Sequence, residues 1–369
     1  MNTLGFDKAP SDTRVVVAMS GGVDSSVTAA LMKEQGFEVI GMTLQLYDHG
    51  AAIKVNNTCC AGQDIHDAKR VADSLSIPHY VLDYESQFKK NVIEDFAASY
   101  IAGETPIPCV RCNQTVKFQD LLGYARDLGA DALITGHYVR RINGSKGPEL
   151  HRALDDSKDQ SYFLFATTPQ QLEFLRFPLG DFEKSETREL AKKFGLQVAD
   201  KPDSQDICFV PNGSYVSVVE RFHPEASIEG DIVDLNGKIL GRHDGIINYT
   251  VGQRRGLGIS EKEPLYVIKI NPKTRQVVVG PKSTLFREDF FVGDINWLGD
   301  GNSPSQGLTV AVKLRSTAEP VAARIIQYKR GRARIELDEP QPGIAPGQAC
   351  VFYQGDRSLG GGWIERSDI

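Results

Sequence analysis

Short apolar runs alternate with amphipathic segments over residues 15–136 of the sequence. Strands covered on both faces read as continuous apolar runs, whereas helices between them carry an apolar stripe at helical spacing. The alternation therefore predicts an α/β fold built on a doubly wound parallel sheet. The predicted strands cover residues 15–19, 38–44, 79–82 and 132–135, and the predicted helices cover residues 23–31, 65–75, 92–100 and 118–128.

The pattern changes after about residue 215. Residues 151–215 are expected to be helical with polar connections, and later residues form brief β runs separated by Gly, Asn and Pro turns. Residues 267–270 and 277–279 flank a turn and predict a hairpin. Five more runs predict a small β-barrel, at residues 308–314, 321–326, 332–337, 349–353 and 361–364. A small β domain followed by a C-terminal β-barrel is therefore expected after the α/β domain.

Length and composition set the class of protein. The chain has 369 residues, enough for two or three domains, and its 41% hydrophobic and 24% charged content is ordinary for a globular protein. No apolar run approaches the roughly 18 residues that span a bilayer, and residues 1–10 lack the features of a leader. A cytoplasmic protein with no membrane partner is expected. Six cysteines at uneven spacing favour thiol chemistry or metal ligation over a disulfide scaffold.

The charge is unevenly distributed along the chain. The net charge is −6, but residues 1–215 hold 22 Lys and Arg against 29 Asp and Glu, while residues 216–369 hold 20 against 19. A cluster of basic residues in the second half is compatible with nucleic-acid phosphates, although a solvated strand face is the simpler interpretation. The cluster comprises Lys313, Arg315, Arg324, Lys329, Arg330, Arg332 and Arg334.

The stretch Ser20–Ser26 follows the first predicted strand and precedes the first predicted helix. Its two glycines permit close backbone approach to an anion, and the first turn of a helix offers unpaired N–H groups to phosphate. The Walker lysine is missing, so this is a different kind of phosphate loop. A simple Gly-Gly connection with Ser and Asp caps is the alternative, which the density of hydroxyls disfavours. The stretch resembles the pyrophosphate loop (PP-loop) of ATP pyrophosphatases, which split ATP into AMP and pyrophosphate while adenylating a substrate oxygen.

Two cysteine-containing segments could supply a nucleophile. The Cys109-x-x-Cys112 pair follows prolines in a predicted loop, which argues against a thioredoxin-like motif, and no second pair completes a zinc site. Cys112 lies between Arg111 and a predicted helix N-cap, Asn113, so positive charge would favour its thiolate. Cys208 lies in a polar loop. A persulfide on one cysteine could displace AMP from an adenylated carbonyl, and a second thiol could then break the S–S bond.

Several segments together resemble the bacterial tRNA-specific 2-thiouridylase family. The resemblance covers nearly the whole chain in order: Ser20–Ser26, Thr105–Asn113 with Lys117 and Phe118, Thr135–Tyr138, Lys158–Phe163, Asp203–Phe209, Gly252–Gly258 and Pro346–Gln348.

The resemblance implies three domains and a reaction. Residues 1–215 would form a PP-loop ATP pyrophosphatase domain, 216–282 a small central β domain, and 283–369 a barrel that helps hold the tRNA anticodon arm. ATP with Mg²⁺ would adenylate the C2 oxygen of the wobble uridine, and sulfur from a persulfide donor protein would replace that oxygen. Cys208 matches the persulfide carrier and Cys112 its nucleophilic partner, which would end as a Cys112–Cys208 disulfide.

The resemblance also implies binding residues. The ATP contacts would be Ala18, Met19, Ser20, Gly21, Gly22, Val23, Asp24, Ser25, Leu44 and Gly136. The loop that meets the target base would be Ile107, Pro108 and Cys109, and further tRNA contacts would be His137, Lys158, Asp159, Gln160, Arg315 and Gln348. For each polar residue taken alone, a surface or capping role is the simpler interpretation.

One departure from the family pattern leaves a further hypothesis. Some family members carry aspartate where this chain has Cys109. Three thiols, Cys109, Cys112 and Cys208, could ligate an iron–sulfur cluster with one open iron. Cys59, Cys60 and Cys350 are expected to be structural. Two rival functions remain: a PP-loop ligase that adenylates a small molecule, and a non-catalytic RNA-binding or redox protein.

Overall fold

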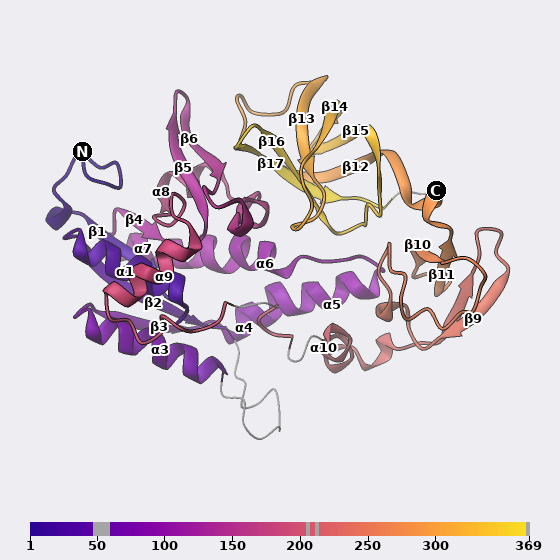
Figure 1. Ribbon diagram of the computed structural model, residues 1–369, viewed down its shortest axis with the longest axis horizontal. Helices are drawn as coiled ribbons and strands as arrows, with labels where there is room; N and C mark the ends of the chain where they lie inside the picture. The colour runs from indigo at the N-terminus through magenta and orange to yellow at the C-terminus, as the bar shows by residue number, and fades with distance from the viewer. Residues whose placement is uncertain (47–59, 204–206, 211–213, 367–369) are drawn as a thin grey trace. The chain divides into compact units, whose positions relative to one another are not determined.

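A computed structural model describes the chain except for residues 47–59, 204–206, 211–213 and 367–369 (Figure 1). The chain divides into two compact units, which we call the sheet unit and the barrel unit. The sheet unit comprises Met1–Asn91, Arg111–Gln205 and Asp356–Ser358, and the barrel unit comprises Val92–Val110, Asp206–Gly355 and Leu359–Ile369. In the described part of the chain, no helix is long and apolar enough to cross a membrane.

A five-stranded parallel sheet forms the centre of the sheet unit, with strand order β3-β2-β1-β4-β7. The order reverses at β1, so right-handed crossovers place helices on both faces and open a crevice at the carboxyl ends of β1 and β4. This confirms the predicted doubly wound sheet. The strands are β1 (Arg14–Ala18), β2 (Glu38–Gln45), β3 (His79–Asp83), β4 (Ala132–Ile134) and β7 (Leu175–Arg176).

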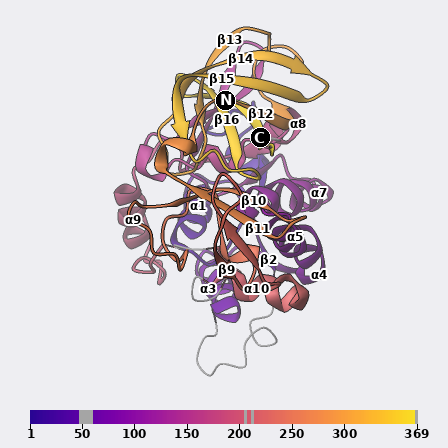
Figure 2. The ribbon, with the colours of Figure 1, turned by 90° about the vertical axis from the view of Figure 1, so that its right-hand side faces the viewer.

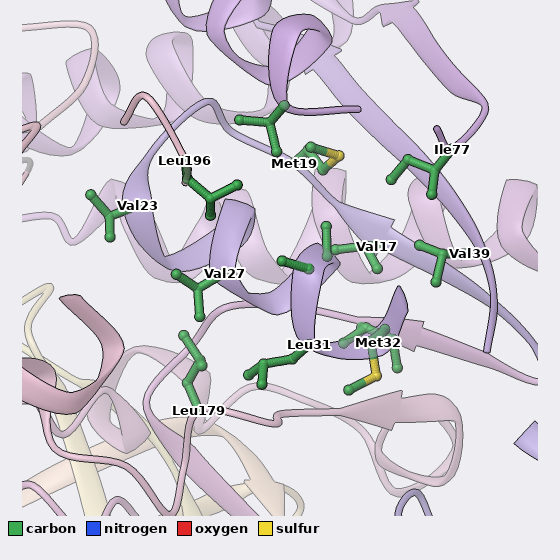
Figure 3. Close-up of a cluster of buried hydrophobic side chains, with 14 of the residues drawn as sticks. Val17, Met19, Val23, Val27, Leu31, Met32, Val39, Ile77, Leu179 and Leu196 are labelled. Carbon is green, nitrogen blue, oxygen red and sulfur yellow. The ribbon is translucent and has the colours of Figure 1, made fainter. Parts of the chain in front are cut away.

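The helices of the sheet unit pack on this sheet through apolar stripes. The first helix, α1, buries one row of apolar residues against the sheet and the opposite row against Leu179 and Leu196 (Figure 3). The helices are α1 (Val23–Glu34), α3 (Cys60–Ser74), α4 (Glu85–Phe88), α7 (Leu122–Asp127), α8 (Pro169–Phe174) and α9 (Lys184–Lys193).

The region after β4 contains a hairpin that the sequence pattern did not predict. A hairpin of β5 (Val139–Gly144) and β6 (Gly147–Arg152) precedes α8, and Arg357 pairs with His151 of β6. The alternating polar and apolar residues of this hairpin are few and interrupted by charge, so the hairpin was missed. The helical prediction, which started at residue 151, wrongly included its last two residues.

The barrel unit holds two all-β sheets. The smaller one has strand order β10-β11-β8-β9 and its own core around Val267 and Val277. Its strands are β8 (Gly230–Val233), β9 (Ile239–His243), β10 (Tyr266–Asn271) and β11 (Gln276–Gly280). The antiparallel β10–β11 pair confirms the predicted hairpin. Two helices, α5 (Glu94–Ile101) and α10 (Tyr215–Phe222), also belong to this unit.

Six strands form a closed barrel around an apolar core (Figure 2). Pairing of β12 with both β15 and β17 closes it. The barrel was predicted, but its strand β12 (Phe286–Trp297) was not among the predicted runs. The other strands are β13 (Leu308–Lys313), β14 (Val321–Lys329), β15 (Arg332–Pro342), β16 (Ala349–Gln354) and β17 (Arg357–Ile364).

Candidate active site

The phosphate loop lies between β1 and α1, at the point where the strand order reverses. Gly22 is the N-cap of α1 and has no side chain that could accept hydrogen bonds from the first-turn N–H groups. The serine hydroxyls bond within the loop: Ser25 Oγ accepts from Ser20 N–H at 3.1 Å, and Ser26 Oγ donates to Gly22 O at 2.8 Å. The hydroxyls therefore shape the loop and leave a helix N-terminus suited to an anion.

Two glycines let backbone segments meet at this loop. Gly21 has φ +75°, and a Cβ there would lie 2.1 Å from Asp64 O. A Cβ on Gly136, just after β4, would lie 2.9 Å from Ser25 N. The structure thus brings predicted ATP contacts from both sides of the switch point together. Leu44 lies near the carboxyl end of the neighbouring strand β2 and is half-buried.

Two lysines hold the loop, and sequence reasoning missed both. Lys184 Nζ donates to Asp24 Oδ1 at 2.6 Å and Oδ2 at 2.8 Å. Lys201 Nζ donates to Gly21 O at 3.0 Å and pairs with Asp64 and Asp67 at 2.7 Å each. Lys184 is the first residue of α9, where the helix dipole disfavours a cation, and this is the one sequence signal that could have marked it.

Burial and ion pairing shift the pKa values of Lys201 and Asp67 in opposite directions. For Lys201, burial lowers the pKa, but hydrogen bonds and charge from Asp64 and Asp67 raise it above its ordinary value. For Asp67, burial raises the pKa, whereas hydrogen bonds from Lys201, Arg70 and Gln63 bring it below its ordinary value. Lys201 and Asp67 therefore both stay charged near neutral pH.

The predicted tRNA contact His137 follows Gly136 and is uncharged at neutral pH. Burial, with a smaller contribution from Lys117, lowers its pKa to about 3. Its Nδ1 lies 2.9 Å from Thr135 Oγ1, and its ring meets the Phe118 ring edge-on. Any contact that this imidazole makes at neutral pH is therefore a neutral hydrogen bond rather than an ion pair.

The run Lys158–Gln160 contacts Tyr138, the residue that follows His137. Gln160 Oε1 accepts from Tyr138 N–H at 2.9 Å, and Lys158 Nζ pairs with Asp203 at 2.9 Å. The Asp159 carboxylate is buried and accepts from Ser161 N–H at 3.1 Å and from Ala153 N–H at 3.2 Å. The Asp159 carboxylate is thus held by two backbone N–H groups, and its predicted role as a tRNA contact stays a prediction.

The C-x-x-C segment is helical, which corrects the loop prediction. Helix α6 spans Pro108–Arg111 and carries exposed Cys109, and the following π-helical stretch Cys112–Leu121 begins at buried Cys112. Proline starts the helix because its missing N–H costs nothing in a first turn. Asn113 lies inside the helical stretch, so it is not an N-cap; its amide donates to Phe163 O at 3.2 Å. Long π-helical stretches are rare and occur often at functional sites.

In the barrel unit, the predicted tRNA contact Gln348 bonds to the segment that leads into the predicted contacts Ile107 and Pro108. Gln348 Nε2 donates to Thr105 O at 2.9 Å, and Thr105 N–H donates to Pro346 O at 2.8 Å. The chain entering Ile107 and Pro108 is therefore fixed to the turn before β16. Arg315 instead donates to Gly343 O at 2.7 Å.

Cys208 is exposed on a short turn of the barrel unit. Val210 N–H donates to Ile207 O at 2.9 Å, and the neighbouring Phe209 is buried against Phe96, with ring centroids 5.2 Å apart. The anchored Phe209 leaves the Cys208 side chain at the surface. Cys112 belongs to the sheet unit and Cys208 to the barrel unit.

The remaining cysteine predictions have different outcomes. Within the described residues, no three His, Cys, Asp or Glu side chains are grouped so that they could hold a metal ion, so the iron–sulfur hypothesis gains no support. Cys350 is buried in the barrel core, and burial raises its pKa well above the ordinary value. Cys59 and the side chain of Cys60 lie outside the described part of the chain.

Three family matches cover most of the chain. Residues 13–212 match the tRNA methyl transferase HUP domain, 217–281 the tRNA methyl transferase PRC-barrel domain, and 287–364 the aminomethyltransferase beta-barrel domain.

Curated relatives match over the whole length. A protein of Rhodospirillum centenum named tRNA-specific 2-thiouridylase MnmA is 63% identical, covering 100% of this chain and 95% of the relative. A protein of the same name from Parvibaculum lavamentivorans is 60% identical, covering 100% of this chain and 94% of the relative. A solved 4-thiouridine synthetase–RNA complex with bound ATP is 18% identical over 57% of this chain and 50% of that chain, with a TM-score of 0.37, which is too low to support a conclusion.

Proposed function

Because the chain belongs to the tRNA-specific 2-thiouridylase family, we propose that it is an ATP-dependent sulfurtransferase that converts the wobble uridine of tRNA to 2-thiouridine. The observation that carries this proposal is the match to relatives of that name at 63% and 60% identity over the full chain. The reaction would consume ATP and a persulfide sulfur, and would release AMP and pyrophosphate.

The phosphate loop supports ATP as the activating substrate. Uncapped N–H groups at the start of α1 and close backbone approach at Gly21 and Gly136 suit a pyrophosphate group. In the proposed first step, the C2 oxygen of the uridine attacks the α-phosphate of Mg-ATP and pyrophosphate leaves. The loop N–H groups stabilise the negative charge that develops on the leaving group. A loop without a Walker lysine fits cleavage at the α-phosphate.

The cysteines would complete the turnover. The terminal sulfur of a Cys208 persulfide attacks C2, and AMP leaves with the former C2 oxygen. The Cys112 thiolate then attacks Cys208 Sγ, which breaks the S–S bond to the new C2 sulfur and leaves 2-thiouridine with a Cys112–Cys208 disulfide. This step requires the two Cα atoms to come within about 4.4–6.8 Å of each other. A reductant and a persulfide donor protein restore the enzyme.

The tRNA-binding role is proposed for residues of both units. Base flipping would bring the uridine to Ile107, Pro108 and Cys109, since chemistry on a base requires that it leave the stack. The fixed contact of Gln348 with Thr105 supports a shared surface for the barrel and this loop. We propose residues 1–215 as the catalytic domain, 216–282 as the central domain and 283–369 as the tRNA-binding barrel.

The test follows nucleosides and nucleotides in one reaction. Full-length protein is incubated with ATP, Mg²⁺, an unmodified tRNA transcript and a persulfidated donor, and digested tRNA is analysed by mass spectrometry. The proposal predicts 2-thiouridine at the wobble position, with AMP and pyrophosphate formed only when tRNA is present. Formation of AMP without tRNA but with a small-molecule acceptor would indicate a PP-loop ligase instead.

Cysteine variants test the assigned roles. Cys208→Ser should abolish the formation of 2-thiouridine. The uridine of the tRNA should still be adenylated, because adenylation precedes sulfur transfer. Cys112→Ser should stop turnover and leave Cys208 linked to tRNA through sulfur. Cys350→Ala is the matched control, since this thiol lies in the barrel core and has no assigned role. Full thiolation by Cys208→Ser contradicts the mechanism.

A further inference from the structure

Tyr138 is a buried tyrosine whose hydroxyl reaches the phosphate loop. Its side chain is 2% exposed, and its Oη donates to Asp24 Oδ1 at 3.1 Å and lies 2.8 Å from Thr187 Oγ1. Burial and the charge of Asp24 raise the pKa of Tyr138, so the phenol stays protonated at neutral pH and remains a donor. Lys184 donates to both oxygens of the same carboxylate. Tyr138 and Lys184 therefore hold the only carboxylate in the stretch Ser20–Ser26.

The backbone of Tyr138 is held by Gln160. Gln160 Oε1 accepts from Tyr138 N–H at 2.9 Å, and Gln160 N–H donates to Tyr138 O at 3.0 Å. Gln160 is the N-cap of the short 3₁₀-helix Ser161–Leu164, most of which is buried. The two bonds fix the chain on both sides of the Tyr138 Cα atom, so a displacement of Gln160 also displaces Tyr138.

The segment that contains Tyr138 touches the loop a second time, two residues earlier. A Cβ on Gly136 would lie 2.9 Å from Asp24 C as well as from Ser25 N, so the two backbones are in direct contact. Between these contacts lies His137, a proposed tRNA contact, and Gln160 belongs to the run of further proposed tRNA contacts. Residues 136–138 therefore connect proposed tRNA contacts to the proposed ATP site, and all these residues belong to the sheet unit.

We propose that Tyr138 is a positioning residue that makes ATP bind more tightly at the phosphate loop when tRNA is bound. The inference rests on the proposed function and supplies a physical reason for adenylation that depends on tRNA. A tRNA bound to His137 and Gln160 restricts this segment and, through Tyr138 Oη, also restricts Asp24. ATP then binds to a loop that is already ordered and loses less conformational entropy. By linkage, ATP strengthens tRNA binding by the same factor.

The experiment measures binding instead of turnover. The Kd of α,β-methylene-ATP with Mg²⁺, which cannot release pyrophosphate, is measured for the full-length protein with and without a saturating tRNA transcript. For the unaltered protein, we expect tRNA to lower this Kd about fivefold or more, as for coupled sites generally. For Tyr138→Phe, which removes only the hydroxyl, we expect the two Kd values to agree within about twofold. A purely structural role would raise both Kd values by the same factor and leave their ratio unchanged.

Thr187→Val is the matched control, because it removes the other hydroxyl beside Tyr138 Oη and keeps the donor to Asp24. We expect this variant to retain the Kd ratio of the unaltered protein. If it loses the ratio as Tyr138→Phe does, the packing around the hydroxyl carries the coupling and the proposal is wrong. A thermal midpoint for each variant ensures that Kd values are compared on folded protein.

A second measurement needs no variant. Because the Tyr138 amide is bonded to Gln160, its hydrogen exchange reports how well this segment is ordered. We expect exchange at this amide to slow when either tRNA or the analogue binds. Exchange that responds to tRNA and not to the analogue would contradict a connection to the phosphate loop.

The proposed function and the coupling fail in different measurements. If the digested tRNA contains no 2-thiouridine, the proposed function fails, and the Kd ratio still decides the coupling. If 2-thiouridine forms but tRNA leaves the Kd of the analogue unchanged, the two sites are not coupled. If they are coupled and Tyr138→Phe keeps the ratio, Tyr138 is not the residue that connects them.

Discussion

The charges around the phosphate loop and those on the barrel strands use the same residue types in different ways. Lys184, Lys201 and Asp203 each contact two or more groups from distant segments, and much of each side chain is buried. On the barrel, Arg332 pairs with Glu365 and Arg334 with Asp289, all at the surface. Four members of the conspicuous basic cluster in the sequence therefore lie exposed on the strands β14 and β15, namely Arg324, Lys329, Arg332 and Arg334, whereas the charges that organise the loop are scattered along the chain. Local charge density is a poor guide to a site.

We expect the largest difference between the two regions when a glycine is replaced by alanine. Gly21 and Gly331 both have positive φ, at +75° and +77°, but only a Cβ on Gly21 would meet backbone, at Asp64 O. We expect Gly21→Ala to lower tRNA-dependent pyrophosphate release about 100-fold or more, because a misplaced loop loses the orientation of its substrate. Gly331→Ala should cost about 1–2 kcal/mol of unfolding free energy and leave pyrophosphate release nearly unchanged. Equal activities would show that the loop tolerates displacement.

Removing one cation should also have a larger effect at the phosphate loop than on the barrel strands. Lys201→Met leaves Asp67 buried without this partner, so we expect unfolding free energy to fall by about 3 kcal/mol, the low end for breaking a buried pair, and KM for ATP to rise. Arg334→Met removes a pair whose side chains are 45% and 40% exposed, and it should cost less than about 1 kcal/mol. Urea unfolding and pyrophosphate kinetics measure both variants. Similar losses for both variants would contradict the contrast.

Acid should weaken the sheet unit through Asp203. Its folded pKa of about 2 lies below its ordinary value of 3.8, so its ion pairs stabilise the fold above about pH 4 and lose this contribution as pH falls toward 2. Between pH 5 and pH 3, we expect the unaltered protein to lose about 1 kcal/mol more unfolding free energy than Asp203→Asn does. Urea unfolding at the two pH values provides the measurement, and parallel losses would refute the linkage.

The smallest expected effect concerns His137. Since burial lowers its pKa to about 3, its imidazole should stay neutral between pH 5 and pH 8. Its ring resonances, assigned by comparison with His137→Gln, should not shift in an NMR titration over that range. A midpoint near 6.5 would show that the ring is more exposed to water than the structure indicates, and that a charged contact with tRNA phosphate is available.

Much of the architecture could be predicted from local pattern. Apolar runs identified β1, β2, β3 and β4. The strands β1, β2 and β4 are largely apolar because the sheet buries both of their faces, whereas the edge strand β3 exposes Tyr80 and Val81. Strand β12 was missed because its charged residues obscure the alternation of Phe290 and Val292, which only the closed barrel buries. Helix α6 was taken for a loop because prolines at Pro106 and Pro108 were treated as breakers, whereas Pro108 starts the helix.

The sequence by itself determined the phosphate loop, the sheet that carries it, the barrel and the family, since these depend on short motifs and regular periodicity. Only the tertiary structure decided which charges serve the loop. Lys184 reaches Asp24 across 160 positions and Lys201 reaches Gly21 across 180. Such pairs produce no periodic pattern in the sequence. The free energy of an ion pair depends on the distance between the charges and on their burial, and not on their separation along the chain.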